Sequence, residues 1–285
     1  MREALLRSTL LSAAVVAGLT SVASADLLWD NGPLATGTIS RASGAAVPGP
    51  GVAAPAGSQW SELYTGNTAA GATVSPSGTT GIFRLADDFT LPAAAQLTSV
   101  TAFAYMTGST DAQLFSIGNI RIWNGRPGDV GATVVFGDTT TDRVTSGALT
   151  DIYRIFATDG SLVGGTNSVP GTTRRIKTAV FDLGGLDLPA GTYWVDYQIT
   201  SAVTPTGAVF HPYITLTDQR GKPGANARQL TAANTWTDLL DTGNPATLPD
   251  IAQDIAFQVE GVIPEPASLG FLALGATGLA FRRRR

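Results

Sequence analysis

Cysteine is absent from the 285 residues, and histidine occurs only once. Without cysteine the chain has no disulfide framework, no thiol nucleophile and no zinc–cysteine site. A single histidine also excludes metal sites built on two or three imidazoles. Charged residues make up 14% of the chain and hydrophobic residues 44%, so the chain can build a core and is not disordered overall.

Basic residues are scarce between residues 26 and 263. This segment contains 12 basic and 20 acidic residues, so its net charge is −8. An acidic segment without a basic stripe argues against nucleic-acid binding, which requires cations that neutralise phosphates. It also argues against charge-driven docking on anionic lipid. Most of the acid is aspartate in turns, where the side chain usually bonds its own backbone. Calcium ligation is the alternative interpretation, and we expect no other cofactor or metal.

The N-terminus has the three parts of a secretory signal peptide. Arg2 and Arg7 give it a positive start, Leu10–Leu19 is an apolar stretch, and Ala23 and Ala25 form an A-x-A cleavage site. We therefore predict that residues 1–25 direct the chain to a Sec-type export machinery and that the mature protein begins at Asp26. A retained membrane helix is the weaker alternative, because the apolar stretch is too short to span comfortably.

The last 22 residues also have the pattern of a sorting signal. A Pro-Glu-Pro turn is followed by an uncharged run and then by an arginine cluster: Pro264, Glu265 and Pro266; Ala267–Phe281; and Arg282, Arg283, Arg284 and Arg285. As a helix the run would measure about 22 Å, which is shorter than a ~30 Å hydrocarbon core. Arginine side chains can snorkel to help it span, and their charge keeps this end cytoplasmic. The pattern predicts a short anchor that holds the preceding domain outside the membrane.

This tail resembles the PEP-CTERM sorting signal of Gram-negative bacteria, because the motif, the apolar run and the arginine cluster occur in the family's order at the extreme C-terminus. The resemblance implies recognition by exosortase, an integral-membrane cysteine transpeptidase. It also implies transient residence in the inner membrane, followed by release or transfer to the cell surface or extracellular matrix. Such proteins commonly occur with exopolysaccharide production, which makes exopolysaccharide a candidate partner. The resemblance implies nothing about the activity of residues 26–263.

Between the predicted signal peptide and the C-terminal tail, runs of alternating or β-branched residues are separated by Gly, Pro, Asn and Asp. No window of helical length holds an apolar stripe with caps. We therefore predict an all-β fold for residues 26–263, as one antiparallel β-sandwich or jelly-roll domain. The expected strands are 27–29, 83–91, 97–106, 118–123, 133–136, 151–157, 176–183, 192–200, 207–210, 213–217 and 255–259.

Two segments depart from this pattern. Residues 41–81 are rich in Gly, Ala and Pro and are expected to be largely irregular, and residues 159–173 form a second Gly-rich loop. Within the first segment, Gln59–Tyr64 is either a strand or a helical turn. Three stretches outside these segments, residues 28–33, 86–89 and 191–194, are similar to β-sandwich domains of other proteins that bear such a tail.

No nucleophile motif is present, and we assign no catalytic residue. His211 is the only imidazole, and we expect a strand-end residue rather than a base, since nothing marks a nucleophile to pair with it. Glycoside hydrolysis needs only two carboxylates. Asp87 and Asp88 are adjacent, so on a strand they would face opposite sides. Two further pairs lie in or beside turns: Asp238 with Asp241, and Asp250 with Asp254.

Aromatic residues give the best binding hypothesis. Alternation along residues 193–198 would put Trp194 and Asp196 on one face of a strand, opposite Tyr193, Val195 and Tyr197. An indole beside polar groups suits stacking on a sugar ring, so the candidate carbohydrate contacts are Trp194, Asp196 and Trp123. The alternative is that each large aromatic fills the core.

The segment that follows Trp123 is a tight turn by composition, because Asn124-Gly125 supplies positive φ cheaply. We expect a hairpin loop here, with calcium binding at Asn124 and Asp129 as the alternative.

These observations favour an exported, non-enzymatic protein of the cell surface or extracellular matrix. A carbohydrate-binding module for exopolysaccharide is the first alternative, and an Asp-dependent glycoside hydrolase is the second.

Overall fold

The computed structural model describes residues 25–40, 51–64, 66–67, 69–74, 76–77, 81–156, 170–200, 209–212, 220–243 and 247–264. Strands, turns and loops account for all of these residues, which confirms the all-β prediction for the part of the chain described. The predicted signal peptide up to residue 24, the tail from Glu265 onward and the expected strand at 213–217 lie outside the described residues, as does most of the loop at 159–173.

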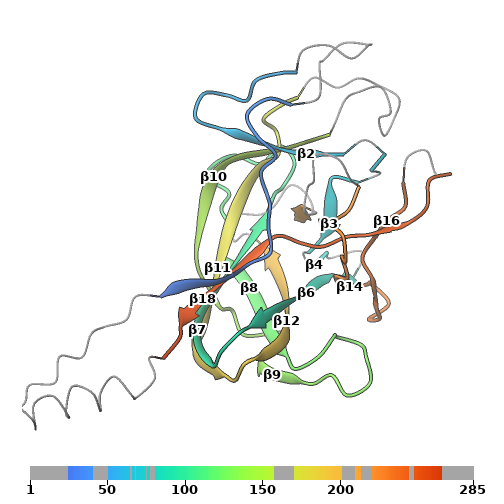
Figure 1. The fold of residues 1–285 in the computed structure, drawn as a ribbon. Helices are drawn as coiled ribbons and strands as arrows, with labels where there is room; N and C mark the ends of the chain where they lie inside the picture. Colours follow the sequence, from blue (N-terminus) through green and yellow to red (C-terminus); the bar gives the residue numbers. More distant parts are fainter. Residues whose placement is uncertain are drawn as a thin grey trace, which may run out of the picture.

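Two six-stranded sheets dominate the fold (Figure 1). The first, here called the β7 sheet, has the order β1 (Asp26–Asp30), β18 (Phe257–Val262), β7 (Ala95–Ala104), β11 (Arg175–Leu188), β10 (Val144–Phe156) and β2 (Gln59–Leu63). The second, here called the β12 sheet, has the order β15 (Trp236–Asp238), β14 (Arg228–Leu230), β6 (Arg84–Leu91), β12 (Gly191–Thr200), β8 (Ile117–Trp123) and β9 (Val134–Gly137). The two sheets together are called the two-sheet body below.

Three short strand pairs complete the described structure. They are β13 (Phe210–Pro212) with β3 (Gly71–Thr73), β16 (Leu240–Asp241) with β17 (Ile251–Ala252), and β4 (Pro76–Ser77) with β5 (Gly81–Ile82).

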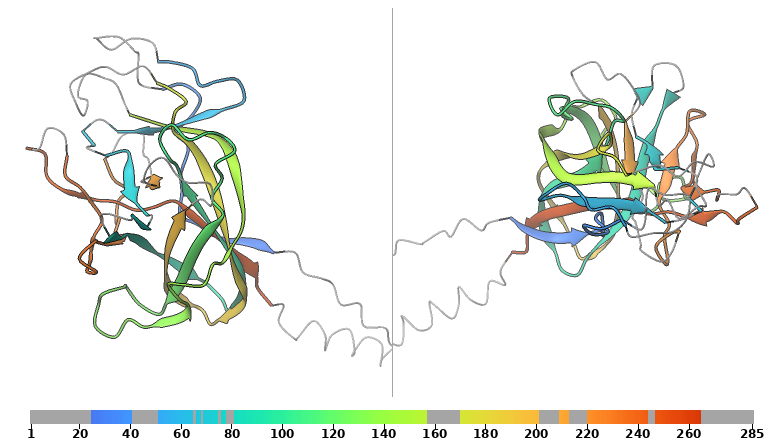
Figure 2. Two further views of the ribbon diagram at one scale, coloured as in Figure 1. Left: turned by 180° about the vertical axis from the view of Figure 1, so that it is seen from behind. Right: turned by 90° about the horizontal axis from the view of Figure 1, so that it is seen from above.

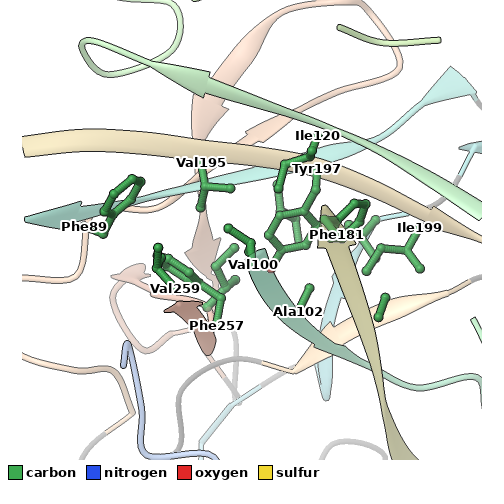
Figure 3. Close-up of a cluster of buried hydrophobic side chains, with 14 of the residues drawn as sticks. Phe89, Val100, Ala102, Ile120, Phe181, Val195, Tyr197, Ile199, Phe257 and Val259 are labelled. Carbon is green, nitrogen blue, oxygen red and sulfur yellow. The ribbon is translucent and has the colours of Figure 1, made fainter. Parts of the chain in front are cut away.

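One hydrophobic cluster joins the inner faces of the two sheets (Figure 3). The β7 sheet contributes alternate residues such as Val100 and Ala102, and the β12 sheet contributes Val195 and Tyr197. Aromatic rings link the layers, with Phe181 and Tyr197 at 5.8 Å between centroids. Burying each such side chain stabilises the fold by roughly 1.5–3 kcal/mol. The period-2 pattern of the sequence therefore produces a two-layer body with its core between the sheets.

The short strands β3, β4, β5 and β14 to β17 are not among the predicted ones, and β10 and β2 differ from the prediction in extent or pairing. β10 begins at Val144, well before the predicted start at residue 151, and includes Gly147. A Cβ at Gly147 would lie 2.2 Å from the Phe115 carbonyl oxygen, so the glycine that resembles a turn signal instead permits close backbone approach. Residues 59–63 form a strand, as one of the two alternatives predicted. This strand pairs with β10 in parallel, which corrects the expectation of a purely antiparallel fold.

The first and last of the described strands lie side by side. β1 pairs with β18, so Asp26 is opposite Gly261. Figures 1 and 2 show both strands leaving the two-sheet body at the same end. Because Val262 pairs with Gln96 near the start of β7, this end also holds the turn between β6 and β7. The predicted signal peptide and the predicted tail are therefore connected to the two-sheet body at the same end.

Candidate functional site on the outer face of the β12 sheet

The three candidate carbohydrate contacts lie together on one face. Tyr193, Val195 and Tyr197 belong to the core cluster, so Trp194 and Asp196 lie on the opposite, outer face of β12. This division of faces confirms the alternation predicted from the sequence. Trp123 is opposite Trp194 in the β12–β8 register, and Arg121 is opposite Asp196.

Asp196 is the centre of a buried polar cluster. Its carboxylate accepts hydrogen bonds from Nε of Arg84 and Nε1 of Trp123, and from Nε of Arg121 at 2.8 Å. The side chains of Asp196 and Arg84 are both 0% exposed. Burial lowers the pKa of the Arg84 guanidinium, and the adjacent Asp196 carboxylate opposes that shift. Asn119 accepts a further bond from Arg84. The carboxylate is thus occupied by three donors of the chain itself.

The β8–β9 loop, residues 124–133, lies across this face and covers Trp194. Arg126 places its guanidinium carbon 5.7 Å from the centroid of the Trp194 ring and donates to Asp238 Oδ1 at 2.8 Å. From the other side, Arg228 donates to Asp129 Oδ1 at 2.9 Å and to the Pro127 carbonyl at 2.8 Å. These contacts tie the loop to β14 and β15, which lie two and three strands beyond Trp194 in the sheet. Trp194 is consequently only 5% exposed.

Trp123 remains partly exposed at the edge of the same face. The guanidinium of Arg121 lies 4.8 Å from the centroid of the Trp123 ring. Of the three candidates, Trp123 is therefore the one whose position allows direct contact with a ligand. Trp194 is covered by the β8–β9 loop, and the Asp196 carboxylate is bonded to neighbouring side chains.

The β8–β9 segment forms the expected hairpin loop, but its positive φ angles lie at Gly128 and Gly131 and not at Asn124-Gly125, where the composition places them. Asn124 Oδ1 accepts from the Thr133 amide at 2.8 Å, and Gly128 has φ +91°. A Cβ at Gly128 would lie 2.8 Å from the Trp236 Cβ, so glycine also permits the close packing of loop and strand. Within the described ranges, no group of three or more His, Asp and Glu side chains is placed to hold a metal ion.

Asp87 and Asp88 face opposite sides of β6, as the sequence predicts. Asp87 points inward and is 1% exposed, whereas Asp88 is opposite Trp194 in register. Asp87 Oδ2 accepts from Asn31 Nδ2 at 2.8 Å and from the Ile255 amide at 3.0 Å. Desolvation by burial raises the pKa of Asp87 well above its usual range, and the nearby Asp254 charge adds to this effect.

The contact between Asn31 and Asp87 is not predicted by the sequence. The two residues fall within two of the stretches noted in the sequence, 28–33 and 86–89, but no local pattern indicates that they are in contact. Asn31 Oδ1 also accepts from Lys222 Nζ at 2.7 Å, and Lys222 lies 3.4 Å from Asp254. The network joins four segments of the chain, around residues 31, 87, 222 and 254.

Three of the remaining candidates are engaged in the fold, whereas Asp250 is exposed. Asp241 is buried and pairs with Arg220 at 2.9 Å, and Asp254 accepts from the Asn226 amide at 2.8 Å. His211 is fully buried in the short strand β13, and its ring centroid lies 5.7 Å from that of Tyr197. His211 is the middle residue of β13 and not the strand-end residue that the sequence predicts.

The described structure ends at Pro264, close to where the similarity to known proteins begins. The family description that matches this chain is the PEP-CTERM protein-sorting motif, over residues 262–285. The chain carries a PEP-CTERM sorting motif. The motif implies an exported protein, exosortase as the processing partner and a membrane-associated tail before release.

The PEP-CTERM match begins where the two-sheet body ends. Neither curated proteins nor solved structures gave a match. Among the residues that the structure describes, no helix is long and apolar enough to cross a membrane. The predicted anchor at 267–281 lies beyond those residues. The body must therefore be interpreted from its own geometry.

Proposed function

We propose that this protein is a non-enzymatic structural component of the cell surface or extracellular matrix, delivered there by its PEP-CTERM tail. One observation carries the proposal: the sorting motif begins at Val262, the last residue of β18. β18 lies between β1 and β7 inside its sheet. A cut after this strand would leave both sheets whole, so the body is suited to delivery as an intact β-sandwich.

The placement of the acidic residues supports a structural role. The three most deeply buried aspartates, Asp87, Asp196 and Asp241, each accept hydrogen bonds from groups of the chain. These contacts fix strands and loops to one another. Three of the carboxylates considered for hydrolysis, Asp87, Asp241 and Asp254, are thus used to hold the fold, which favours a scaffold over an Asp-dependent hydrolase.

Deleting residues 264–285 tests the delivery step. In the producing organism, the full chain should reach the cell surface or the matrix, whereas the truncated chain should be found as a soluble exported protein. Surface immunolabelling and fractionation measure the difference. Equal surface labelling of both chains would contradict tail-dependent delivery. Turnover of any glycan by purified residues 26–263 would contradict the non-enzymatic role.

Carbohydrate binding is the second candidate, and the partly exposed Trp123 favours it. Residues 26–263 can be co-sedimented with the organism's own extracellular polysaccharide, with calcium and with chelator. Under this alternative, Trp123→Ala should abolish saturable binding at a temperature where circular dichroism shows that the variant is still folded, because loss of the Nε1 donor to Asp196 also lowers its stability. Loss of binding in chelator would make exposed aspartates ligand candidates. Absence of binding under both conditions leaves the structural role.

A further inference from the structure

The end of the two-sheet body from which β1 and β18 leave carries two open apolar pockets. The larger, about 290 Å³, is lined by residues that include Ala94, Pro189 and Pro264. The smaller, about 120 Å³, is lined by residues that include Leu27, Pro92 and Ile263. Ala95 lines both pockets, so they lie on either side of the β6–β7 turn. Together these residues define the apolar end.

The chain leaves the body between the two pockets. Ile263 lines one and Pro264 the other, although they are neighbours in sequence. Leu27 is 54% exposed and Ile263 is 46% exposed, and both line the same pocket, so they form part of one apolar patch. Among the described residues that line the pockets, Asp187 is the one charged side chain. The surface beside the exit is therefore apolar and slightly acidic.

The length of chain beyond Pro264 brings the apolar end close to any membrane that holds the tail. The uncharged run begins at Ala267, three residues later, and three extended residues span at most about 11 Å. The interfacial layer of a bilayer is roughly 5–8 Å thick on each side. As a helix, residues 267–281 would reach only about 22 Å across a ~30 Å core, which draws Pro264 further inward.

We propose that the apolar end docks on the membrane surface while the tail is inserted, with Leu27, Pro92 and Ile263 in the headgroup layer. The partner is a zwitterionic phospholipid surface, because the lining offers apolar contact and no cation for anionic headgroups. The inference rests on the membrane-associated tail of the proposed function. Docking would hold the Pro-Glu-Pro motif at headgroup level, beside the body.

The absence of cysteine makes a direct test available, because one introduced cysteine carries the only label. Residues 26–285 are reconstituted into phosphatidylcholine vesicles with a polarity-sensitive fluorophore on Leu27→Cys. Ile39→Cys is the matched control: it is also an exposed aliphatic residue, at 60%, and lies toward the opposite end of the β7 sheet, near β2. Ala276→Cys reports tail insertion independently. Lipid-borne quenchers at shallow and deep positions measure depth.

Docking predicts a blue shift at Leu27→Cys and quenching by the shallow quencher, at the roughly 5–10 Å depth of interfacial apolar groups. Ile39→Cys should show neither, and Ala276→Cys should be quenched by the deep quencher. Adding Ile263→Asp should remove the quenching at Leu27→Cys and leave that at Ala276→Cys intact. The Leu27→Cys signal should not increase when anionic lipid is added.

Three results would overturn the proposal. Quenching at Ala276→Cys without quenching at Leu27→Cys would show an inserted tail with an undocked body, and tail-dependent delivery would be unaffected. A blue shift at Leu27→Cys without lipid quenching would show that the apolar end is covered by the tail or by a second copy. Absence of quenching at Ala276→Cys would show that the tail is not inserted in the membrane, which would also contradict the proposed delivery.

Discussion

Asp196 in β12 and Arg84 in β6 form an ion pair on the outer face of their sheet in which both side chains are fully buried. The same carboxylate also holds Arg121 and the indole of Trp123. A buried charge is stable only while its partner remains, because its solvation has been lost. Asp196 is thus a structural anchor of the surface for which the sequence suggests a sugar-binding role.

Replacing Asp196 by Asn should strongly destabilise the protein. The substitution keeps the shape of the side chain but leaves the Arg84 guanidinium buried without its counter-charge. We expect the free energy of unfolding to fall by about 3–5 kcal/mol, measured by urea denaturation followed by tryptophan fluorescence.

Asp129→Asn is the matched control for this substitution, because its pair with Arg228 is half-exposed, with 53% of the Asp129 side chain accessible. Exposed pairs are usually worth about 0–1 kcal/mol. Equal losses for Asp196→Asn and Asp129→Asn would show that the buried pair contributes no more than a surface one.

Contacts between residues close in sequence can be predicted for this site, whereas contacts between residues far apart in sequence cannot. Alternation along residues 193–198 is local, and it correctly separates the core-facing side chains of β12 from Trp194 and Asp196. The partner of Asp196, Arg84, is 112 residues away in sequence, and no local pattern indicates that their strands are adjacent. The burial of both therefore could not be predicted.

The β8–β9 loop is likewise predictable only in its local structure. Its composition predicts a hairpin loop, which is present, but the positive φ angles fall at Gly128 and Gly131 instead of Asn124-Gly125. That the loop crosses two strands and covers Trp194 depends on Arg126 and Arg228 reaching residues about 100 positions away. Similarly, the predicted β10 is too short because Gly147 resembles a strand breaker, whereas its missing side chain admits the Phe115 carbonyl.

Gly128→Ala should lift the β8–β9 loop and expose Trp194. The new Cβ would lie 2.8 Å from the Trp236 Cβ, at a backbone φ of +91°. We expect a red shift of tryptophan emission and stronger acrylamide quenching. Gly131→Ala separates packing from backbone strain, because Gly131 has nearly the same φ, +90°, and no atom lies within 4 Å of the place that an alanine methyl would occupy. A similar spectral change in both variants would attribute the effect to strain alone.

Tyr197→Phe should stabilise the protein or leave its stability unchanged. Within the described residues, the buried Tyr197 hydroxyl has no hydrogen-bond partner, and burial raises its pKa well above the usual range. Removing an unsatisfied hydroxyl relieves a desolvation cost of about 1–3 kcal/mol. Thermal unfolding followed by circular dichroism measures the effect.

Tyr193→Phe is the comparison for Tyr197→Phe, because the Tyr193 hydroxyl donates to the Pro189 carbonyl at 3.1 Å. Its removal should cost roughly 0.5–1.5 kcal/mol. If Tyr197→Phe were the more damaging of the two, the hydroxyl of Tyr197 would have to be satisfied in the folded protein.

Asp87 should make the protein less stable as the pH rises. Its pKa in the folded state is raised by burial above the ordinary value of 3.8, so the folded protein binds the proton more tightly than the unfolded chain. This contribution to stability is complete below the unfolded pKa and is lost as the pH rises through the folded pKa. The advantage of the native protein over Asp87→Asn in urea denaturation should therefore shrink as the pH is raised from the acid range through the folded pKa of Asp87.

Asp138 supplies the control of opposite sign. Hydrogen bonds from Thr141 and Thr140 hold the pKa of its exposed carboxyl below the usual range, so its contribution appears above the unfolded pKa and is lost as the pH falls. The difference between the native protein and Asp138→Asn should grow as the pH rises from the acid range. If the Asp87→Asn difference also grew with pH, the donors from Asn31, Ile255 and Asp88 would outweigh desolvation, and Asp87 would be buried as an anion.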